Sequence, residues 1–166
     1  NPLGFYGKSK LEGELALKKL TSSWCIARTS TPFGIHPTKK SFPLWVKENL
    51  EMKKEISVLI DQFTSPTYVP NLSKMLIEIA TRQINGIIHV SGATRISRYA
   101  LAEMIAGKFH LNKNLLIPTK IDNMNWKAQR PKDSSLDVSL ATKSLNERPQ
   151  KIEQSIELFV NELNSI

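Results

Sequence analysis

A tyrosine and a lysine near the start of the chain have the chemistry and spacing of a proton-transfer pair. Tyr6 and Lys10 stand four residues apart, where Leu11, Leu15 and Leu20 begin to recur at helical intervals. Residues i and i+4 of a helix share one face and lie about 6 Å apart. An ammonium beside a phenol favours the phenolate, so the phenol can exchange a proton with an alcohol or carbonyl oxygen. The alternative is an amphipathic helix that carries both side chains on a solvated flank.

The segments that must position this pair alternate between strand-like and helix-like patterns. Apolar runs at 24–27, 56–60 and 86–92 are typical of buried strands, and a shorter one lies near 115–117. Helical spacing is predicted up to about residue 20 and around 42–50, 72–79, 98–109 and 152–163, with Ser41 and Ser97 as N-caps and with Leu72, Met75, Leu76 and Ile79 on the apolar face of the third helix. This alternation predicts an α/β fold with a largely parallel sheet.

Two polar segments follow strands in this scheme. Residues 28–34 come after the first strand, and ligands of doubly wound sheets lie at the carboxyl ends of strands, so this segment is a candidate for a binding site. Residues 61–70 contain two prolines and are predicted to form a loop.

The composition limits the partners that the chain is expected to have. No apolar run approaches the roughly 20 residues that span a bilayer, and there is no signal-peptide layout, so we expect a cytoplasmic protein with no membrane partner. The net charge is +8, but the lysine pairs are dispersed and no nucleic-acid-binding signature is present. We therefore expect a solvated basic surface and no nucleic-acid partner.

The cysteine and histidine residues give no sign of a disulfide or a metal site. Cys25 is the single cysteine and lies in an apolar run, which is typical of a small buried side chain in a reducing compartment. His36, His89 and His110 are far apart and have no ligand spacing.

Four motifs carry a resemblance to a known family. The active-site helix of extended short-chain dehydrogenases/reductases, with the pattern Tyr-Gly-x-Ser-Lys-x-x-Gly-Glu, resembles Tyr6-Gly7-Lys8-Ser9-Lys10-Leu11-Glu12-Gly13-Glu14. Three further segments are similar to one branch, the dTDP-4-dehydrorhamnose reductases. These segments are Arg28 to Gly34, Asp61-Gln62 with Pro66-Thr67, and Ala128, Arg130, Pro131, Ser134, Leu136 and Asp137.

The resemblance implies a fold and a reaction. The fold would be a Rossmann-like doubly wound parallel sheet with a smaller substrate-binding α/β portion. The reaction would be reduction of the 4-keto group of a dTDP-deoxysugar by NADPH or NADH, leading to dTDP-rhamnose. The resemblance allows either NADPH or NADH as the cofactor, and it allows a homodimer.

The resemblance also implies roles for individual residues. Tyr6 would protonate the 4-oxygen, and Lys10 would stabilise the phenolate and bind the ribose hydroxyls of the cofactor. The segment Thr29, Ser30, Thr31 and Pro32 would lie beside the nicotinamide. The substrate would be bound by Thr31, Gln62, Thr67 and Arg130, with Arg130 on the diphosphate. Structural alternatives are a turn at Thr67 and a salt bridge at Arg130.

The chain departs from the family pattern in ways that leave other functions open. Thr31 replaces an aromatic residue, Thr64 replaces a glycine, and no glycine-rich dinucleotide-binding turn is present. We therefore expect residues 1–166 to be the C-terminal portion of a reductase whose glycine-rich half is absent, and to be inactive alone. The alternatives are a regulatory subunit similar to that of methionine adenosyltransferase, and a nucleotide-sugar epimerase or dehydratase.

Overall fold

The computed structural model describes residues 2–165. Its helices are α1 (Phe5–Leu20), α2 (Phe42–Glu51), α3 (Val69–Thr81), α4 (Arg98–Lys108), α5 (Ser139–Ser144) and α6 (Ile152–Asn164), with short 3-10 helices η1 (Lys113–Leu115) and η2 (Ile121–Asn123). Its strands are β1 (Cys25–Arg28), β2 (Pro32–Phe33), β3 (Ile56–Leu59), β4 (Phe63–Thr64), β5 (Thr67–Tyr68), β6 (Gly86–His89), β7 (Ile96–Ser97) and β8 (Leu116–Thr119).

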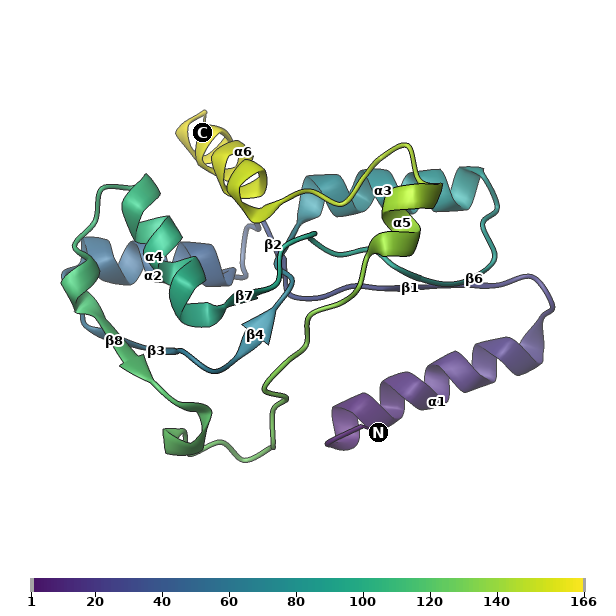
Figure 1. Cartoon of the computed structure of the whole chain (residues 1–166), viewed down its shortest axis with the longest axis horizontal. Coiled ribbons are helices and arrows are strands. Elements are labelled where there is room, and N and C mark those ends of the chain that lie inside the picture. The colour runs from purple at the N-terminus through teal and green to yellow at the C-terminus, as the bar shows by residue number, and fades with distance from the viewer. Residues whose placement is uncertain (1, 166) are drawn as a thin grey trace.

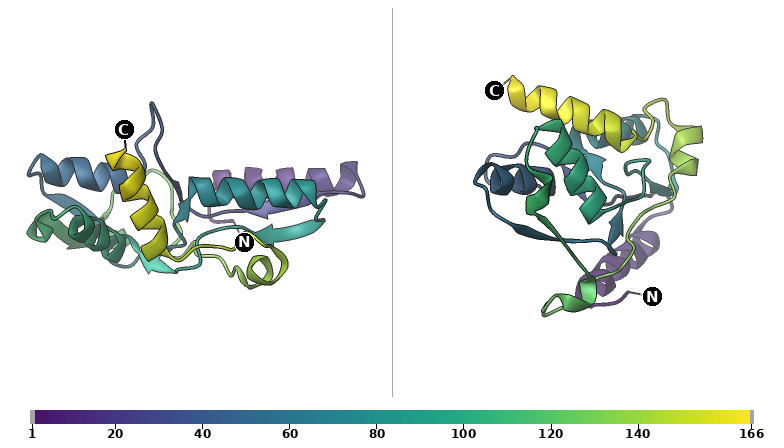
Figure 2. Two further views of the ribbon diagram at one scale, coloured as in Figure 1. Left: turned by 90° about the horizontal axis from the view of Figure 1, so that it is seen from above. Right: turned by 60° about the vertical axis from the view of Figure 1, so that its left-hand side comes forward.

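The strand pairing confirms the predicted α/β class. In the described part of the chain β1 pairs with β6, β2 with β5 and β3 with β8, all in parallel, whereas β4 and β7 are antiparallel. The β1–β6 pair has α3 on one side and α1 on the other (Figure 1). The β3–β8 pair lies at the opposite end of the molecule beside α2 and α4 (Figures 1 and 2). Helices on both sides of parallel strands are the arrangement expected of a doubly wound sheet.

Apolar side chains form two buried clusters, one at each end of the molecule. The smaller joins α3 to β6 and α5, and its buried members are Met75, Ile79, Ile88, Val90, Ala141 and Leu145. The larger joins α2, β3, α4, β8 and α6, and includes Val46, Val58, Leu101, Ile105, Ile156 and Phe159. Each helix contributes residues three and four positions apart, as a one-sided apolar stripe requires.

A tyrosine connects the central strands to the last helix. The Tyr68 hydroxyl on β5 donates to a carboxylate oxygen of Glu162 on α6 at 2.6 Å. Burial, followed by this bond, raises the pKa of Tyr68 above its ordinary value. The ring of Phe33 lies between Tyr68 and Phe159, with centroid distances of 5.7 and 5.6 Å. Aromatic pairs at these separations add packing energy beyond area burial and fix the end of β2.

One local expectation is confirmed and three are corrected. Ser97 caps α4 as predicted, accepting from the Ala100 amide at 3.1 Å. The Ser41 side chain does not cap α2, because its hydroxyl donates to the Gly34 carbonyl at 3.2 Å. The segment predicted as a loop contains β4 and β5, and α3 begins at Val69, so Pro70 occupies the first helical turn, where a missing N–H is tolerated. Leu76 lies on the outer side of α3 rather than on its buried face.

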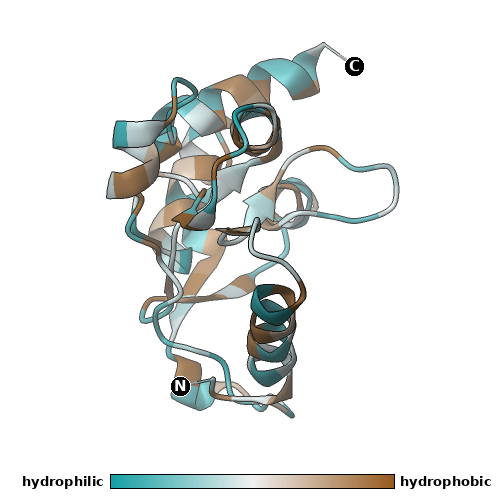
Figure 3. Cartoon of the chain, turned by 90° about the vertical axis from the view of Figure 1, so that its right-hand side faces the viewer, coloured by the Kyte–Doolittle hydropathy of each residue, from teal (hydrophilic) through white to brown (hydrophobic). Residues whose placement is uncertain are grey.

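Helix α1 is held differently from the other long helices. None of its residues is buried, and Phe5, Leu11, Leu15 and Leu20 are all exposed. Its ribbon carries hydrophobic residues beside hydrophilic ones (Figure 3), and it lies at the edge of the molecule next to β1 (Figure 1). Within residues 2–165, no helix is both long enough and apolar enough to span a bilayer.

Candidate functional site

The structure brings Tyr6 and Lys10 together on the first turns of α1. The Lys10 ammonium nitrogen lies 5.5 Å from the centroid of the Tyr6 ring. Tyr6 is 76% exposed and Lys10 is also exposed, so both groups are open to a bound molecule. The Ser9 hydroxyl donates to the Tyr6 carbonyl at 2.9 Å. The helix thus presents a phenol ring and an ammonium side by side, as the spacing of the two residues predicted. Their role in catalysis stays a prediction.

An ion pair between two of the motifs attaches α1 to the end of β1. The Arg28 guanidinium donates to both carboxylate oxygens of Glu14, with distances of 2.8 Å and 2.5 Å. This bond to Arg28 is the main cause that lowers the pKa of Glu14 and raises that of Arg28. α1 buries no side chain, and this pair joins it to β1 together with the Lys18 ammonium, which lies 5.2 Å from the centroid of the Trp24 ring. The two contacts thereby position Tyr6 and Lys10 relative to the loop that follows Arg28.

We predict that Glu14→Gln loosens α1 in this chain. Amide hydrogen exchange in α1 should become about two- to fivefold faster, because partly exposed ion pairs contribute a fraction of a kcal/mol to local stability. Glu12→Gln is the matched control, since Glu12 is exposed and forms no ion pair with any described residue. Equal exchange in the two variants would show that the Glu14 pair does not hold the helix.

The same pair predicts how α1 responds to acid. A carboxyl group whose pKa is lowered by folding stabilises the fold above its unfolded pKa, and the stabilisation is lost as pH falls through the lowered value. For Glu14 the ordinary value is 4.5, so protection of α1 should decline below that pH after correction for intrinsic exchange. The Glu14→Gln variant should lack this extra decline.

The loop after β1 contains backbone strain at one of the predicted site residues. Thr31 has a φ of 44°, a left-handed conformation that β-branched residues rarely adopt. Such a conformation costs about 1–2 kcal/mol and persists where neighbours hold it. The Thr67 amide donates to the Thr31 carbonyl at 3.2 Å, and the two hydroxyls of Ser30 and Thr31 are 3.1 Å apart. Thr29 on this loop and Pro32 at the start of β2 were also predicted to contact a cofactor, and both residues are exposed.

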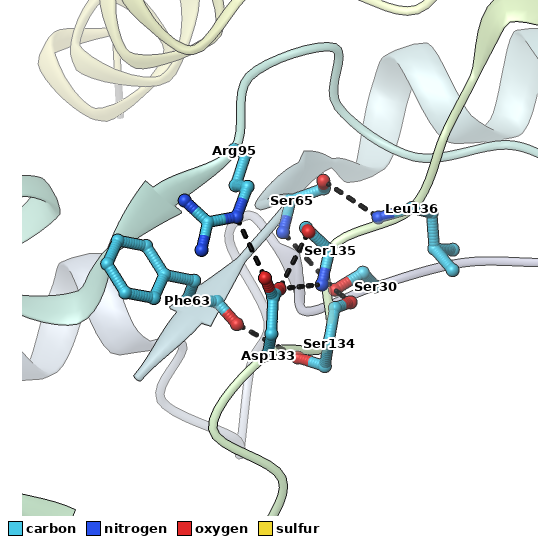
Figure 4. A network of polar contacts seen from close by, with 8 residues as sticks. All are labelled: Ser30, Phe63, Ser65, Arg95, Asp133, Ser134, Ser135 and Leu136. Carbon is cyan, nitrogen blue, oxygen red and sulfur yellow. Dashed lines mark hydrogen bonds and ion pairs between the residues drawn. The ribbon is translucent and has the colours of Figure 1, made fainter. Parts of the chain in front are cut away.

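A polar network joins three of the motifs (Figure 4). The buried Ser30 hydroxyl donates to the Ser134 carbonyl at 2.8 Å and accepts from the Ser65 amide at 3.4 Å. The Ser65 hydroxyl in turn accepts from the Leu136 amide at 3.2 Å. The segments that follow β1, follow β4 and follow Arg130 are therefore fixed against one another. The resemblance does not predict these hydrogen bonds, because the positions of the serines along the sequence do not show which groups they contact in the fold.

Asp133 anchors the outer edge of this network. It accepts from the Ser135 amide at 2.9 Å and from Arg95 Nε at 2.8 Å, while Arg95 lies 3.8 Å from the centroid of the Phe63 ring. Hydrogen bonds from Ser135, followed by Arg95, lower the pKa of Asp133. The chain that follows Arg130 is thus tied to β4 and to the segment before β7.

Thr67 is fully buried and its hydroxyl is engaged within the fold. It donates to the Ser30 carbonyl at 2.6 Å, lies 3.1 Å from the Ser65 carbonyl, and accepts from the Gly92 amide at 3.1 Å. These partners use its single proton and an acceptor position. Thr67 therefore joins the ends of β1 and β6 to the loop before β5. A direct contact with substrate stays a prediction.

Gln62 and Arg130 line one pocket of about 410 Å³ at the end of β3. The Gln62 side-chain Nε2 donates to the Pro131 backbone carbonyl at 3.3 Å, and the Gln62 backbone carbonyl accepts from the Arg98 backbone amide at 3.0 Å. Gln62 thus fixes the positions of both arginine-bearing segments around the pocket. Its remaining lining residues include Lys40, Phe42, Trp45, Leu59, Met124 and Trp126.

Sequence reasoning missed several residues of this pocket. Phe42 and Trp45 lie in the segment 42–50 that was predicted only to be helical, and their rings stack at 5.9 Å and line the pocket. Arg98 follows the correctly predicted cap Ser97, but a surface arginine at a helix start is common and gives no signal of its own. Trp126 lies four residues before Arg130, and this aromatic–basic spacing in a loop was the one available sign.

Tyr6 and Lys10 do not line this pocket. Leu3, which precedes α1, lines an adjoining hollow of about 360 Å³ together with Trp126 and Arg130. The start of the Tyr6 helix and the Arg130 loop therefore border the same region.

The comparisons with known proteins decide the family. The model described as the RmlD substrate binding domain matches residues 1–165. The chain belongs to this family. The RmlD substrate binding domain of this chain is 31% identical to a dTDP-4-dehydrorhamnose reductase of Aggregatibacter actinomycetemcomitans, covering 94% of this chain and 56% of that protein.

Two further known proteins are similar to this chain. Methionine adenosyltransferase 2 subunit beta of Danio rerio is 31% identical, over 84% of this chain and 45% of that protein. A crystal structure of dTDP-4-dehydrorhamnose reductase from Bacillus anthracis in complex with NADP superposes with a TM-score of 0.89 at 28% identity, covering 98% of this chain and 57% of that one. The chain thus spans about half the length of the curated relatives that it matches.

Proposed function

We propose that this chain is the C-terminal portion of an NAD(P)H-dependent reductase acting in the cytoplasm. The full-length protein would reduce the 4-keto group of dTDP-4-dehydro-6-deoxy-L-mannose to give dTDP-L-rhamnose. The observation that carries the proposal is the Lys10 ammonium beside the Tyr6 ring, on an exposed helix within the matching motif. The reductases of A. actinomycetemcomitans and B. anthracis support the same reading.

The residues near α1 fit a nicotinamide cofactor by their chemistry. An exposed phenol and ammonium on one helix face can hydrogen-bond ribose hydroxyls, and the exposed residue Thr29 lies on the loop that follows β1. The Glu14–Arg28 pair joins that helix to that loop. NADPH or NADH supplies a hydride when bound.

The protein's own contribution is proton transfer and orientation. The Tyr6 hydroxyl would give its proton to the 4-oxygen of the sugar as that oxygen gains negative charge, and the phenolate would regain a proton from solvent. The Lys10 ammonium would stabilise the phenolate in the interval. Thr31 would border the sugar, and Gln62 and Arg130 would bind the nucleotide part within the pocket that they share.

The direct test is turnover by the full-length protein. Supplied with dTDP-4-dehydro-6-deoxy-L-mannose, it should oxidise NADPH or NADH and yield dTDP-L-rhamnose, and a comparison of the two cofactors assigns the preference. Absence of turnover with both, in a protein that binds its cofactor, would contradict the proposal.

A second candidate function is that of a regulatory subunit of methionine adenosyltransferase. It is favoured by the similarity to the Danio rerio subunit and by Thr31, which removes the aromatic side chain expected next to the sugar. Loss of such a platform forgoes about 1 kcal/mol or more of apolar contact. Stable co-purification with a methionine adenosyltransferase catalytic subunit, without reductase turnover, would support this function over the first.

A further inference from the structure

The pocket at the end of β3 contains two arginines that lack a carboxylate partner. Arg98 and Arg130 both line it, and neither forms an ion pair with any residue in the range 2–165. The third cation of the pocket, Lys40, is neutralised by Glu48 at 2.6 Å. Two guanidinium groups that share a pocket repel each other, so an arrangement without an acidic partner favours a bound anion.

Each of these guanidinium groups rests on an aromatic ring. The central guanidinium carbon of Arg98 lies 4.8 Å from the centroid of Phe42, and that of Arg130 lies 4.4 Å from the centroid of Trp126. The negative face of each ring attracts the cation above it, and no described carboxylate takes up the N–H donors of either guanidinium group. The two rings therefore help to keep both guanidinium groups at the pocket.

Arg98 is the less exposed of the two arginines. Burial, followed by the charge of Arg130, lowers its pKa, which means that its charged form is disfavoured by its surroundings. An oxyanion between the two groups would relieve that cost and gain charge-assisted hydrogen bonds from both.

The remaining walls define the rest of the ligand. Trp45, Leu59 and Met124 give the pocket an apolar side next to its basic side. A volume of about 410 Å³ is within the usual range for small-molecule sites. A flat apolar ring joined to adjacent anionic groups matches both sides, and a nucleoside diphosphate has this chemistry.

We infer that Arg98 is a second diphosphate-binding residue, which acts with Arg130 to make the pocket prefer a nucleoside diphosphate over a nucleoside monophosphate. The inference rests on the proposed function for the nucleotide class, and it adds a specificity-determining residue to that site. Arg130 can contact one phosphate group through its fork. The Arg98 fork accounts for recognition of the other.

The test is calorimetric binding of dTDP and dTMP to the full-length protein. Arg98→Gln should weaken dTDP binding by about 10- to 100-fold, as expected for loss of charge-assisted hydrogen bonds, and should change dTMP binding much less. Lys108→Gln is the matched control, because Lys108 belongs to the same helix, carries the same charge and lies outside the pocket. It should bind both nucleotides as the wild type does.

A stability measurement separates binding from a purely structural role. The melting temperature of Arg98→Gln without nucleotide should equal or exceed that of the wild type, because the substitution removes a half-buried charge next to Arg130. A lower melting temperature together with equal weakening of dTDP and dTMP would overturn the inference, since Arg98 would then only support the fold.

The outcomes also distinguish this inference from the reductase proposal. If dTDP binding depends on Arg98 but the protein does not reduce the keto sugar, the inference about Arg98 holds and the reductase proposal is contradicted. If the protein reduces the keto sugar and its Arg98→Gln variant binds dTDP as tightly as the wild type does, the reductase proposal holds and the inference about Arg98 is wrong.

Discussion

Replacing Tyr6 with phenylalanine should lower kcat of the full-length protein by about 10²- to 10⁴-fold, the usual contribution of a positioned proton donor. The substitution removes the hydroxyl and keeps the ring over which the Lys10 ammonium lies. Tyr6 is exposed, so folding should be unaffected and dTDP binding should stay close to that of the wild type. Steady-state kinetics with the dTDP-keto sugar and the preferred cofactor measure the effect.

Tyr99→Phe is a suitable control for this experiment. Tyr99 lies on α4, packs against the larger core and does not line the pocket at the end of β3. Its loss of a hydroxyl should leave kcat nearly unchanged. A Tyr6→Phe protein that turns over at the wild-type rate would remove Tyr6 from the reaction, and the proton would have to come from another group.

Replacing Gly92 with alanine should destabilise the protein by about 3 kcal/mol or more, at the upper end of the cost of overpacking. A Cβ at this position would lie 2.0 Å from the Pro66 carbonyl oxygen, and that neighbour is backbone rather than a movable side chain. The Gly92 amide also donates to Thr67. The added methyl group would therefore force apart the end of β6 and the Pro66-Thr67 motif. Urea denaturation of this chain measures the loss.

Gly13→Ala is the matched control for Gly92→Ala. A Cβ on Gly13 meets no atom within 4 Å, and the residue lies in the middle of helix α1. Alanine there should leave global stability unchanged or raise it by up to about 1 kcal/mol, because glycine is a poor helix former. If the two variants unfold at the same urea concentration, the contact of Gly92 with Pro66 is less tight than the structure indicates.

The elements that sequence patterns predict well are those with one dominant apolar stripe or run. The α6 spacing of Ile152, Ile156 and Phe159 agrees with the buried face of that helix, and the run at 24–27 overlaps β1. In these elements burial on one side decides both the local structure and its packing. The predicted α/β class with parallel pairing follows from their order along the chain.

The pocket at the end of β3 could not be predicted in the same way. Periodicity shows that Phe42 and Trp45 are on a helix, but it does not tell whether an aromatic residue faces a core or a pocket. The resemblance pointed to Gln62 and Arg130, whereas Arg98 and Trp126 reach the pocket only because β3, α4 and the Arg130 loop converge in space. Tertiary convergence of this kind leaves no mark in local spacing.

The hydrogen bond between Ser30 and Ser134 has a consequence for how the chain folds. Its two residues are 104 positions apart, and contacts across such long separations form slowly because a large loop must close first. During synthesis, Ser134 must emerge from the ribosome before the Ser30 hydroxyl can donate to its carbonyl. The three joined motifs therefore assemble late, because this network cannot close until the segment around Ser134 has emerged.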